Sequence, residues 1–234
     1  MDILGKALLD HYHGRATEDI RTLSTLEHDD VLPLSHLFRS FDGMPILEQR
    51  ALGLCRGTVL DVGCGAGSHS LWLQEQGLRV TALDRSAGAI AVCQLRGVQR
   101  TAHQTFLEHS AARYDTLLLL MNGLGIVGQL SQLDAYLAKM KTLLKPGGQI
   151  LLDSSDLAYL YETDADGGLW VPGDRDYYGE LGFTMAYQGE VSETFDWLYL
   201  DFNTLERAAA HHDLNCEKVQ EGEHYDYLAR LWCR

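Results

Sequence analysis

The sequence predicts an α/β protein with a doubly wound, mostly parallel β-sheet. Short apolar segments alternate with segments of helical period between residues 58 and 152. The first apolar segment, at residues 58–62, ends in a run of glycines, as a buried strand does before a tight turn into a helix. Repeated strand–helix–strand units of this length favour parallel strands joined by right-handed crossovers.

The elements of this central region follow in a regular order. Strands are expected at residues 58–62, 79–83, 116–121 and 149–152, and helices at 68–76, 86–95 and 131–145. The last of these helices is the clearest, because Leu133, Leu137 and Met140 recur on one apolar face and Pro146 ends it. Residues 1–56 favour helices interrupted by glycine and proline, and we expect them to form an N-terminal helical cap.

The pattern changes after residue 153. Alternating residues at 183–187 and a return strand at 195–200 predict a β-hairpin within an insertion, residues 154–202. Asn203 is expected to cap a helix over residues 205–212. The chain is therefore divided into the cap at 1–56, a core at 57–153, the insertion at 154–202, and a last helix with two antiparallel strands at 203–234.

The acidic charge of the chain is unevenly distributed. The formal net charge of −14 divides into −1 for residues 1–150 and −13 for residues 151–234. Nucleic acids and anionic membrane surfaces are bound by lysine and arginine, so this excess argues against both as partners. The five cysteines form no CxxC pair, and neither a signal peptide nor a membrane helix is evident. These features favour a reduced, soluble, cytoplasmic protein.

The most informative stretch is Asp61-Val62-Gly63-Cys64-Gly65-Ala66-Gly67-Ser68, between a strand and a helix. Its glycines let a ligand approach the backbone closely, and the start of the helix offers free N–H groups. Asp84 ends the next strand, where a carboxylate can accept hydrogen bonds from both hydroxyls of a ribose. A dinucleotide fingerprint would need glycine or alanine at position 68, where this chain has Ser68.

The pattern D-x-G-x-G-x-G with a later acid resembles that of the class I S-adenosylmethionine-dependent methyltransferases. The resemblance covers residues 58–153 through VLDVGCGAG, VTALD, YDTLLLLMNG and LLKPGGQILLD, in that order. It implies a Rossmann-like methyltransferase fold, with a seven-stranded, mostly parallel sheet completed by two antiparallel strands. It also implies that the core binds S-adenosylmethionine, while the cap and the insertion cover the cofactor and form the substrate pocket.

The resemblance also assigns cofactor contacts. The turn of Gly63, Gly65 and Gly67 would approach the methionine part of the cofactor. Asp61 would bind the amino group, and Asp84, with its neighbour Arg85, would lie at the ribose. Asn122, in the turn after the strand at 116–121, would lie near the methyl group.

One position departs from the family pattern. The family usually places an acidic residue after the third strand to accept a hydrogen bond from the adenine amino group. The corresponding residue here is Gln104 or Thr105, neither of them acidic, although both can accept through a side-chain oxygen.

Candidates for the substrate side are mostly tyrosines. Tyr12 and Arg39, in the cap, could reach the cofactor carboxylate as in the family, and the other candidates are Tyr177, Tyr178, His224 and Tyr225. Tyrosines at alternating strand positions are equally typical of a core, so both interpretations stay open. His224, Tyr177 or Glu180 could act as a general base, but no constellation identifies a catalytic residue. No metal-binding pattern is evident.

These observations together predict an S-adenosylmethionine-dependent methyltransferase that acts on a small, neutral or cationic molecule by in-line methyl transfer. One alternative is a non-catalytic S-adenosylmethionine-binding interaction or regulatory protein. A second, disfavoured by Ser68, is an NAD-dependent dehydrogenase. The oligomeric state is left open by the sequence.

Overall fold

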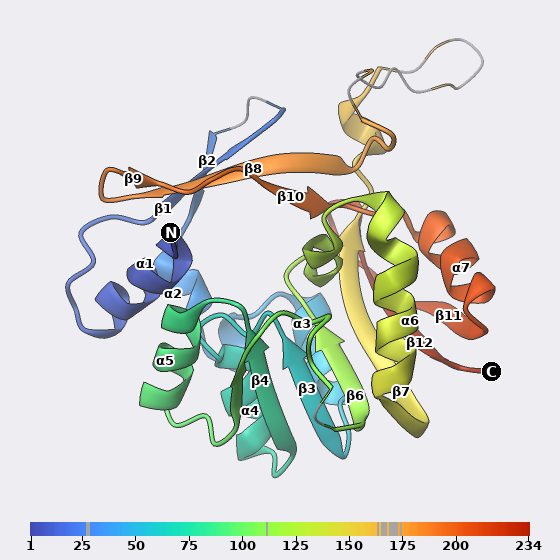
Figure 1. The fold of residues 1–234 in the computed structure, drawn as a ribbon, viewed down its shortest axis with the longest axis horizontal. Coiled ribbons are helices and arrows are strands. Elements are labelled where there is room, and N and C mark those ends of the chain that lie inside the picture. Colours follow the sequence, from blue (N-terminus) through green and yellow to red (C-terminus); the bar gives the residue numbers. More distant parts are fainter. Residues whose placement is uncertain (27–28, 111, 163, 165–167, 169–172, 174) are drawn as a thin grey trace.

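Two β-sheets organise the chain. The structure is a computed structural model of residues 1–234 and describes all of them except residues 27–28, 111, 163, 165–167, 169–172 and 174. A seven-stranded sheet forms the centre of the molecule, and a smaller sheet lies across one of its edges (Figure 1).

The large sheet has the strand order β11-β12-β7-β6-β3-β4-β5. Its strands are β3 (Thr58–Val62), β4 (Arg79–Asp84), β5 (Thr101–His103), β6 (Tyr114–Leu119), β7 (Leu144–Ser155), β11 (Leu214–Glu221) and β12 (Asp226–Cys233). Strands β3 to β7 are parallel to one another, while β12 and β11 are antiparallel to their neighbours. This topology confirms the predicted Rossmann-like, mostly parallel sheet.

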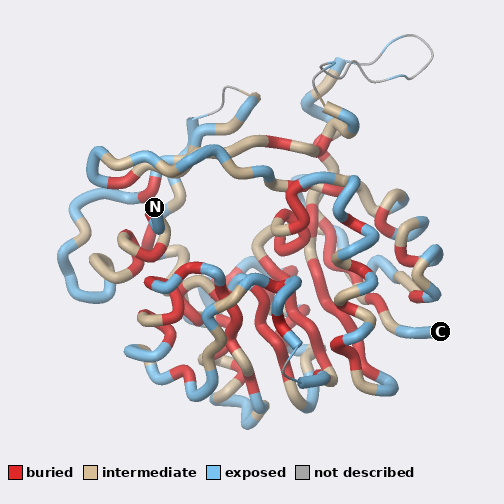
Figure 2. The backbone as a smooth tube through the Cα atoms, viewed as in Figure 1, coloured by how far each residue is buried: buried red, intermediate tan, exposed pale blue. Residues whose placement is uncertain are grey.

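Helices cover both faces of the large sheet. The helices on one face are α3 (Ile46–Leu54), α4 (Ser68–Glu75) and α5 (Ala87–Leu95), and those on the other are α6 (Leu133–Leu143) and α7 (Phe202–His211). Successive strand residues alternate between these layers: Leu118 packs with α3 and α4, while Leu117 packs with α6 and α7. The central strands are therefore the most buried part of the chain (Figure 2).

The small sheet combines two segments that are far apart in the sequence. Its strands are β1 (Ile20–Ser24), β2 (Asp29–Leu32), β8 (Glu180–Tyr187), β9 (Glu190–Val191) and β10 (Phe195–Leu198). The expected hairpin is present, since β8 pairs with β10 and β9. The prediction of a purely helical cap is wrong, because β1 and β2 separate α1 (Ile3–Tyr12) from α2 (Leu34–Leu37). Strand β1 pairs with β8 of the insertion, a long-range contact that local sequence pattern does not reveal.

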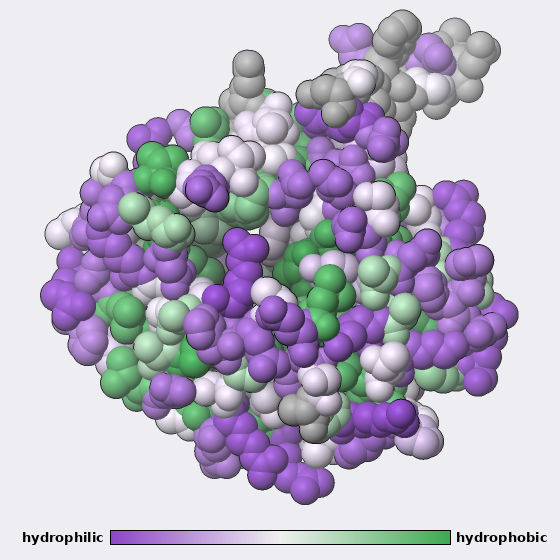
Figure 3. Space-filling model, in the orientation of Figure 1, coloured by the Kyte–Doolittle hydropathy of each residue, from purple (hydrophilic) through white to green (hydrophobic). Residues whose placement is uncertain are grey.

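The small sheet lies over the carboxyl ends of the parallel strands. The arrowheads of β3, β4 and β6 point toward it (Figure 1), and the surface is hollowed between the two sheets (Figure 3). Ligands of open α/β sheets bind at this edge. In the described part of the chain, no helix has both the length and the apolar character needed to cross a membrane.

Helix α1 closes one side of this edge by packing tightly on α5. A Cβ atom added to Gly88 would lie 2.4 Å from Gly5 Cα, so the two helices touch through their backbones. The Asp2 carboxylate accepts hydrogen bonds from Gly5 N (2.9 Å), Ser86 Oγ (2.9 Å) and Gly88 N (3.0 Å). Asp2 thereby caps α1 and fixes it to the segment that follows β4.

Replacing Gly88 with alanine should lower the free energy of unfolding by about 1–3 kcal/mol, because the new methyl group would overlap the Gly5 backbone. Urea unfolding measures the change. Gly53→Ala is the matched control: Gly53 also lies within a helix, and an added Cβ there meets no atom within 4 Å. The control should be neutral or stabilising by about 1 kcal/mol. Equal stability of the two variants would contradict the close crossing.

Candidate active site

The glycine turn at the end of β3 leaves space on its outer side. Gly63 and Gly65 have φ angles of 72° and 53°, and a Cβ on either would meet no atom within 4 Å. Gly63 N donates to Leu83 O (2.8 Å), which holds the turn against β4. Gly67 differs, because a Cβ there would lie 2.8 Å from Cys93 Sγ. The first two glycines therefore leave room for a ligand, and the third allows α5 to pack.

Asp84 lies buried beside this turn. Its carboxylate accepts hydrogen bonds from Gly65 N (3.0 Å) and Ser86 N (2.8 Å). Burial raises the pKa of Asp84, and these two N–H donors oppose the rise. Each oxygen retains a further lone pair, so the fixed carboxylate can still accept from a ribose. Arg85, its neighbour, is exposed.

Asp61 lies at the end of β3, but its carboxylate is engaged by α4. Ser70 Oγ donates to Asp61 Oδ2 at 2.6 Å, and both residues are buried. Burial raises the pKa of Asp61, while the nearby His69 and the hydrogen bonds from Ser70 act in the opposite direction. A role for Asp61 toward the amino group of the cofactor stays a prediction.

A buried ion cluster adjoins the first turn of α4. The Arg39 guanidinium donates to both carboxylate oxygens of Glu48, and His69 Nε2 lies 2.8 Å from Glu48 Oε2. The three side chains are only 7%, 6% and 11% exposed, in the order Arg39, Glu48 and His69. Burial alone would raise the pKa of Glu48, but the hydrogen bond and charge of His69 and the charge of Arg39 outweigh it and lower that pKa.

This cluster contains one buried donor that the described residues do not satisfy. Arg39 Nε has no hydrogen-bond partner among them, although its side chain is almost fully buried. Buried polar groups are rarely left unpaired, and a carboxylate is the natural acceptor for a guanidinium N–H. Together with the open glycine turn and Asp84, this donor fits the methionine and ribose parts of S-adenosylmethionine.

The turn after β6 has an unusual backbone. Met121 and Asn122 have φ angles of 66° and 52°, in a region that non-glycine residues seldom adopt. Asp153, two residues before the end of β7, holds this turn by accepting from Met121 N (3.0 Å) and Gly123 N (2.8 Å). Such backbone strain is concentrated at functional sites.

The Asn122 side chain joins this turn to the small sheet. Its Nδ2 donates to Leu198 O (3.2 Å), and its Oδ1 accepts from Ser154 Oγ (2.9 Å). The same Ser154 oxygen accepts from Leu200 N (3.0 Å). Asn122 is therefore held between β7 and the segment that follows β10, at the edge where the methyl group is expected.

Asp153 is a site residue that sequence reasoning missed. The signal was present, since Asp153 ends the apolar segment of β7 just as Asp61 and Asp84 occur at the ends of theirs. Burial raises the pKa of Asp153 to about 6, and the N–H donors of the turn oppose this rise. Glu48, the other missed group, lies in a helix without a marked apolar stripe and gave no such signal.

Asp153 should make the protein less stable as the pH rises. Its pKa is about 6 in the folded state, against 3.8 for an ordinary aspartate, so the folded state holds this proton more tightly than the unfolded chain. The contribution of Asp153 to the free energy of unfolding should fall by about 3 kcal/mol between about pH 4 and pH 6, at about 1.4 kcal/mol per pKa unit. Urea unfolding of Asp153→Asn, which cannot titrate, should lack this decrease. Parallel pH profiles of the two proteins would contradict the assignment.

The two residues expected to contact adenine, Gln104 and Thr105, are bonded to neighbouring groups. Gln104 N donates to Asp84 O (3.1 Å), and its side-chain oxygen lies 2.9 Å from His109 Nδ1. Thr105 Oγ donates to Glu108 Oε2 at 2.7 Å. Both side chains thus already have local partners, and their contact with adenine stays a prediction.

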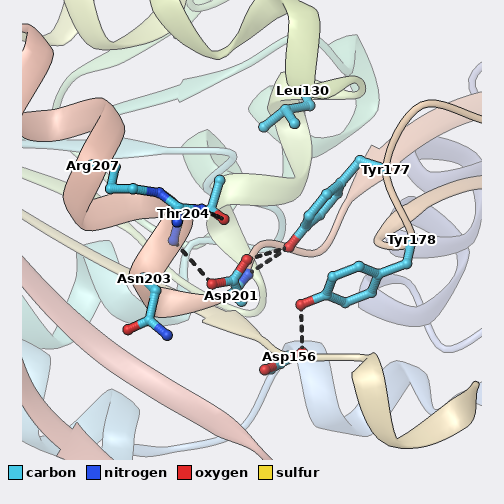
Figure 4. Close-up of a pocket in the computed structure, with 8 residues that line it drawn as sticks. All are labelled: Leu130, Asp156, Tyr177, Tyr178, Asp201, Asn203, Thr204 and Arg207. Carbon is cyan, nitrogen blue, oxygen red and sulfur yellow. Dashed lines mark hydrogen bonds between the residues drawn. The ribbon is translucent and has the colours of Figure 1, made fainter. Parts of the chain in front are cut away.

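Two of the tyrosine candidates lie together in a pocket of about 540 Å³ (Figure 4). Tyr177 Oη donates to Asp201 Oδ2 (2.7 Å), and Tyr178 Oη donates to Asp156 Oδ1 (2.7 Å). The remaining lining residues are Leu130, Asn203, Thr204 and Arg207. Tyr225 lines an adjoining pocket of about 430 Å³. Burial raises the pKa of both Tyr177 and Tyr178, so both hydroxyls are protonated donors at neutral pH.

The other candidates are exposed or already bonded to other groups. Tyr12, at the opposite end of α1 from Asp2, donates its hydroxyl to Leu95 O (3.1 Å) and is exposed. His224 is exposed, in the turn between β11 and β12. Glu180 Oε1 accepts from Leu130 N (2.7 Å), so this carboxylate already holds a backbone group. No general base is identified by these contacts.

Comparisons with known proteins agree with this geometry. The profile of a family described as "Methyltransferase domain" matches residues 59–148. The chain is 45% identical in sequence to an S-adenosylmethionine-dependent methyltransferase from Bacteroides fragilis, whose crystal structure contains S-adenosyl-L-homocysteine. That alignment has a TM-score of 0.90 and covers 99% of this chain and 94% of the other.

Two curated relatives are similar over shorter stretches. One is a malonyl-[acyl-carrier protein] O-methyltransferase of Serratia marcescens, 32% identical over 64% of this chain and 61% of the relative. The other is a ubiquinone biosynthesis O-methyltransferase of Sodalis glossinidius, 28% identical over 45% of this chain and 44% of the relative. The matches thus span less than two thirds of the length of either relative.

Proposed function

Because the chain belongs to the S-adenosylmethionine-dependent methyltransferases, we propose that it transfers a methyl group from this cosubstrate to a small, neutral or cationic acceptor. The proposal is based on the groups that gather at the carboxyl ends of the parallel strands of the large sheet. There the open turn at Gly63 and Gly65, the fixed carboxylate of Asp84 and the strained turn at Asn122 lie at the ends of neighbouring strands.

Each of these groups has a role in holding the cosubstrate. Gly63 and Gly65 permit close approach of the methionine part, and Arg39 Nε offers a donor to its carboxylate. Asp84 accepts from the ribose hydroxyls, and its bonds to Gly65 and Ser86 fix its position before the ligand arrives. Such preorganisation reduces the entropy lost on binding.

When bound, S-adenosylmethionine supplies a methyl group on a positively charged sulfur, which is already an activated leaving group. The protein therefore has to align the acceptor and keep water away rather than provide strong acid or base chemistry. Asn122 is fixed for that task from two sides, by Ser154 and by Leu198 O. The small sheet lies over the same edge, where it can limit the access of water (Figure 1).

The charge of the last third supports the acceptor class. Residues 151–234 have a net charge of −13, and the tyrosine pocket contains Asp156 and Asp201. A negative potential raises the local concentration of cations and disfavours phosphorylated acceptors. The two curated relatives are named O-methyltransferases, which supports including oxygen acceptors among those tested.

Two measurements test the proposal. Isothermal titration with S-adenosylhomocysteine should show binding at one site. NADH should not compete with it, whereas the dehydrogenase alternative would require that NADH binds. Turnover of methyl-labelled S-adenosylmethionine is then followed with a panel of amines, phenols and carboxylic acids and their phosphorylated analogues. Preferential methylation of the phosphorylated members would contradict the acceptor class. Tight cofactor binding without turnover of any acceptor or metabolite extract would favour the non-catalytic alternative.

A further inference from the structure

The two tyrosine-lined pockets adjoin at the end of β7. Asp156, Asp201 and Asn203 line both of them, so we treat the two as one joined pocket. Asp156 follows β7 directly, and Asp201 is the N-cap of α7, accepting from Thr204 N at 2.9 Å. Both carboxylates are thus held in place by the ends of regular elements (Figure 4).

Two carboxylates of the joined pocket, Asp156 and Asp201, have no cation close beside them, although the charge of Arg207 attracts Asp201 from a longer distance. In the described part of the chain, neither Asp156 nor Asp201 forms an ion pair within 4 Å. Lys218, which lines the joined pocket, is instead held by Glu221 at 2.6 Å and by the Phe202 ring at 5.0 Å. The negative charge of Asp156 is therefore available to a ligand, and that of Asp201 is only partly offset by Arg207.

Aromatic rings surround these carboxylates. The Tyr177 and Tyr178 ring centroids are 4.4 Å apart, and Tyr225 stacks on Tyr159 at the same distance. Ring faces attract organic cations, most strongly where a carboxylate lies beside them. Tyr177 Oη donates to Asp201 Oδ2 and accepts from Asp201 N (3.0 Å), so both of its roles are used within the protein. Tyr178 Oη donates to Asp156, so toward a ligand its oxygen presents lone pairs, which accept from an ammonium N–H.

We propose that the joined pocket binds an organic ammonium group of the methyl acceptor. This inference deepens the proposed function, on which it rests, by naming the chemical group that the last third of the chain recognises. Phosphates and carboxylates are disfavoured there, because Arg207 is directed to Thr204 Oγ (2.9 Å) and the acidic lining residues outnumber the basic ones.

The joined pocket lies close enough to the strained turn to serve one small molecule. Ser154, which bonds Asn122, is two residues before Asp156 on the same extended segment, a separation of about 7 Å. The Ser154 hydroxyl also accepts from Leu200 N, and Asp201 is the next residue. An acceptor could therefore place its ammonium group between the carboxylates and its nucleophile at the Asn122 turn.

The test compares three probes of equal size: cyclohexylammonium, cyclohexanol and cyclohexanecarboxylate. Each is titrated into the full chain saturated with S-adenosylhomocysteine, and binding is followed by ligand-observed NMR. Cyclohexylammonium should bind at least about tenfold more tightly than the other two, and Asp156→Asn should remove about that factor. Asp156→Glu, which keeps the charge, should retain the preference. Asp29→Asn, on the small sheet, is the matched acidic control and should leave all three affinities unchanged.

The outcomes separate this inference from the proposed function. The inference would be overturned if the three probes bound with equal affinity. It would also be overturned if the ammonium preference survived Asp156→Asn in a protein that still melts cooperatively. Neither result would affect cofactor binding. Failure of S-adenosylhomocysteine to bind would instead count against the proposed function. The ammonium titration would then be repeated on the unliganded chain. Competition between cyclohexylammonium and a turned-over acceptor would support a shared site, and its absence would contradict the placement on the acceptor path.

Discussion

Replacing Glu48 with alanine should lower the free energy of unfolding by about 3–5 kcal/mol, the largest effect we expect of any single substitution. Glu48 is the carboxylate that balances Arg39, and the Arg39 side chain is only 7% exposed. Without Glu48 the guanidinium would remain buried without a counter-charge, and His69 would lose its 2.8 Å partner. Urea unfolding at neutral pH measures the loss.

Two controls identify the cause of that loss. Glu217→Ala removes a carboxylate whose partner, Arg230, lies 3.4 Å away at the surface, and should cost at most about 1 kcal/mol. The double variant Arg39→Met/Glu48→Leu replaces the ion pair with apolar groups and should recover most of the stability. If the double variant were no more stable than Glu48→Ala, lost packing rather than an unpaired charge would be responsible.

Replacing Asp84 with alanine should weaken S-adenosylhomocysteine binding by about 10- to 100-fold. The substitution removes the acceptor for the ribose hydroxyls. It also removes the bond from Gly65 N that holds the glycine turn and the bond from Ser86 N, the N-cap of α5. Isothermal titration measures the affinity. Asp84→Asn keeps one acceptor oxygen and should show a smaller loss.

Asp115→Ala is the control that distinguishes a loss of cofactor affinity from a general loss of stability. Asp115 accepts from Thr58 N (2.7 Å) and pairs with Lys145 (2.8 Å), at the opposite edge of the large sheet from the glycine turn. Its loss should lower the melting temperature without changing the cofactor affinity. Unchanged affinity in a folded Asp84→Ala protein would remove Asp84 from the site.

The sequence was informative where one short segment determines both the type of an element and the place of the site residues at its end. Strands β3, β4 and β6 and the centre of β7 contain short apolar runs, so these strands and their carboxyl edge could be predicted, together with the glycine turn and Asp84. The first residues of β7, at 144–148, were not expected in a strand. Local pattern was less reliable for helix ends. Asn203 was expected to cap a helix over residues 205–212, whereas α7 begins three residues earlier, at Phe202, and its cap is Asp201.

The parts that could not be predicted depend on contacts between distant segments. Strand β1 is stabilised by pairing with β8, and β2 pairs in turn with β1. The hydrogen bonds that Asp153 accepts from the Met121 turn require that β6 and β7 lie side by side. Glu48 is the same kind of case, because its buried partners come from two other segments of the chain. Burial of a charged residue is a property of the assembled fold, and the residue's own neighbours in the sequence do not encode it.

The small sheet combines strands from two distant segments of the chain, and this affects the order of folding. Strand β1 pairs with β8, so the sheet cannot form until the ribosome has released residues near 187, long after β3 to β7 have been synthesised. Pairings between remote segments also form slowly, because a long loop must first be closed. A newly made chain therefore has its cofactor turn exposed before the cover exists. A ligand that binds the covered form more tightly than the uncovered one would then favour closure of the sheet over it.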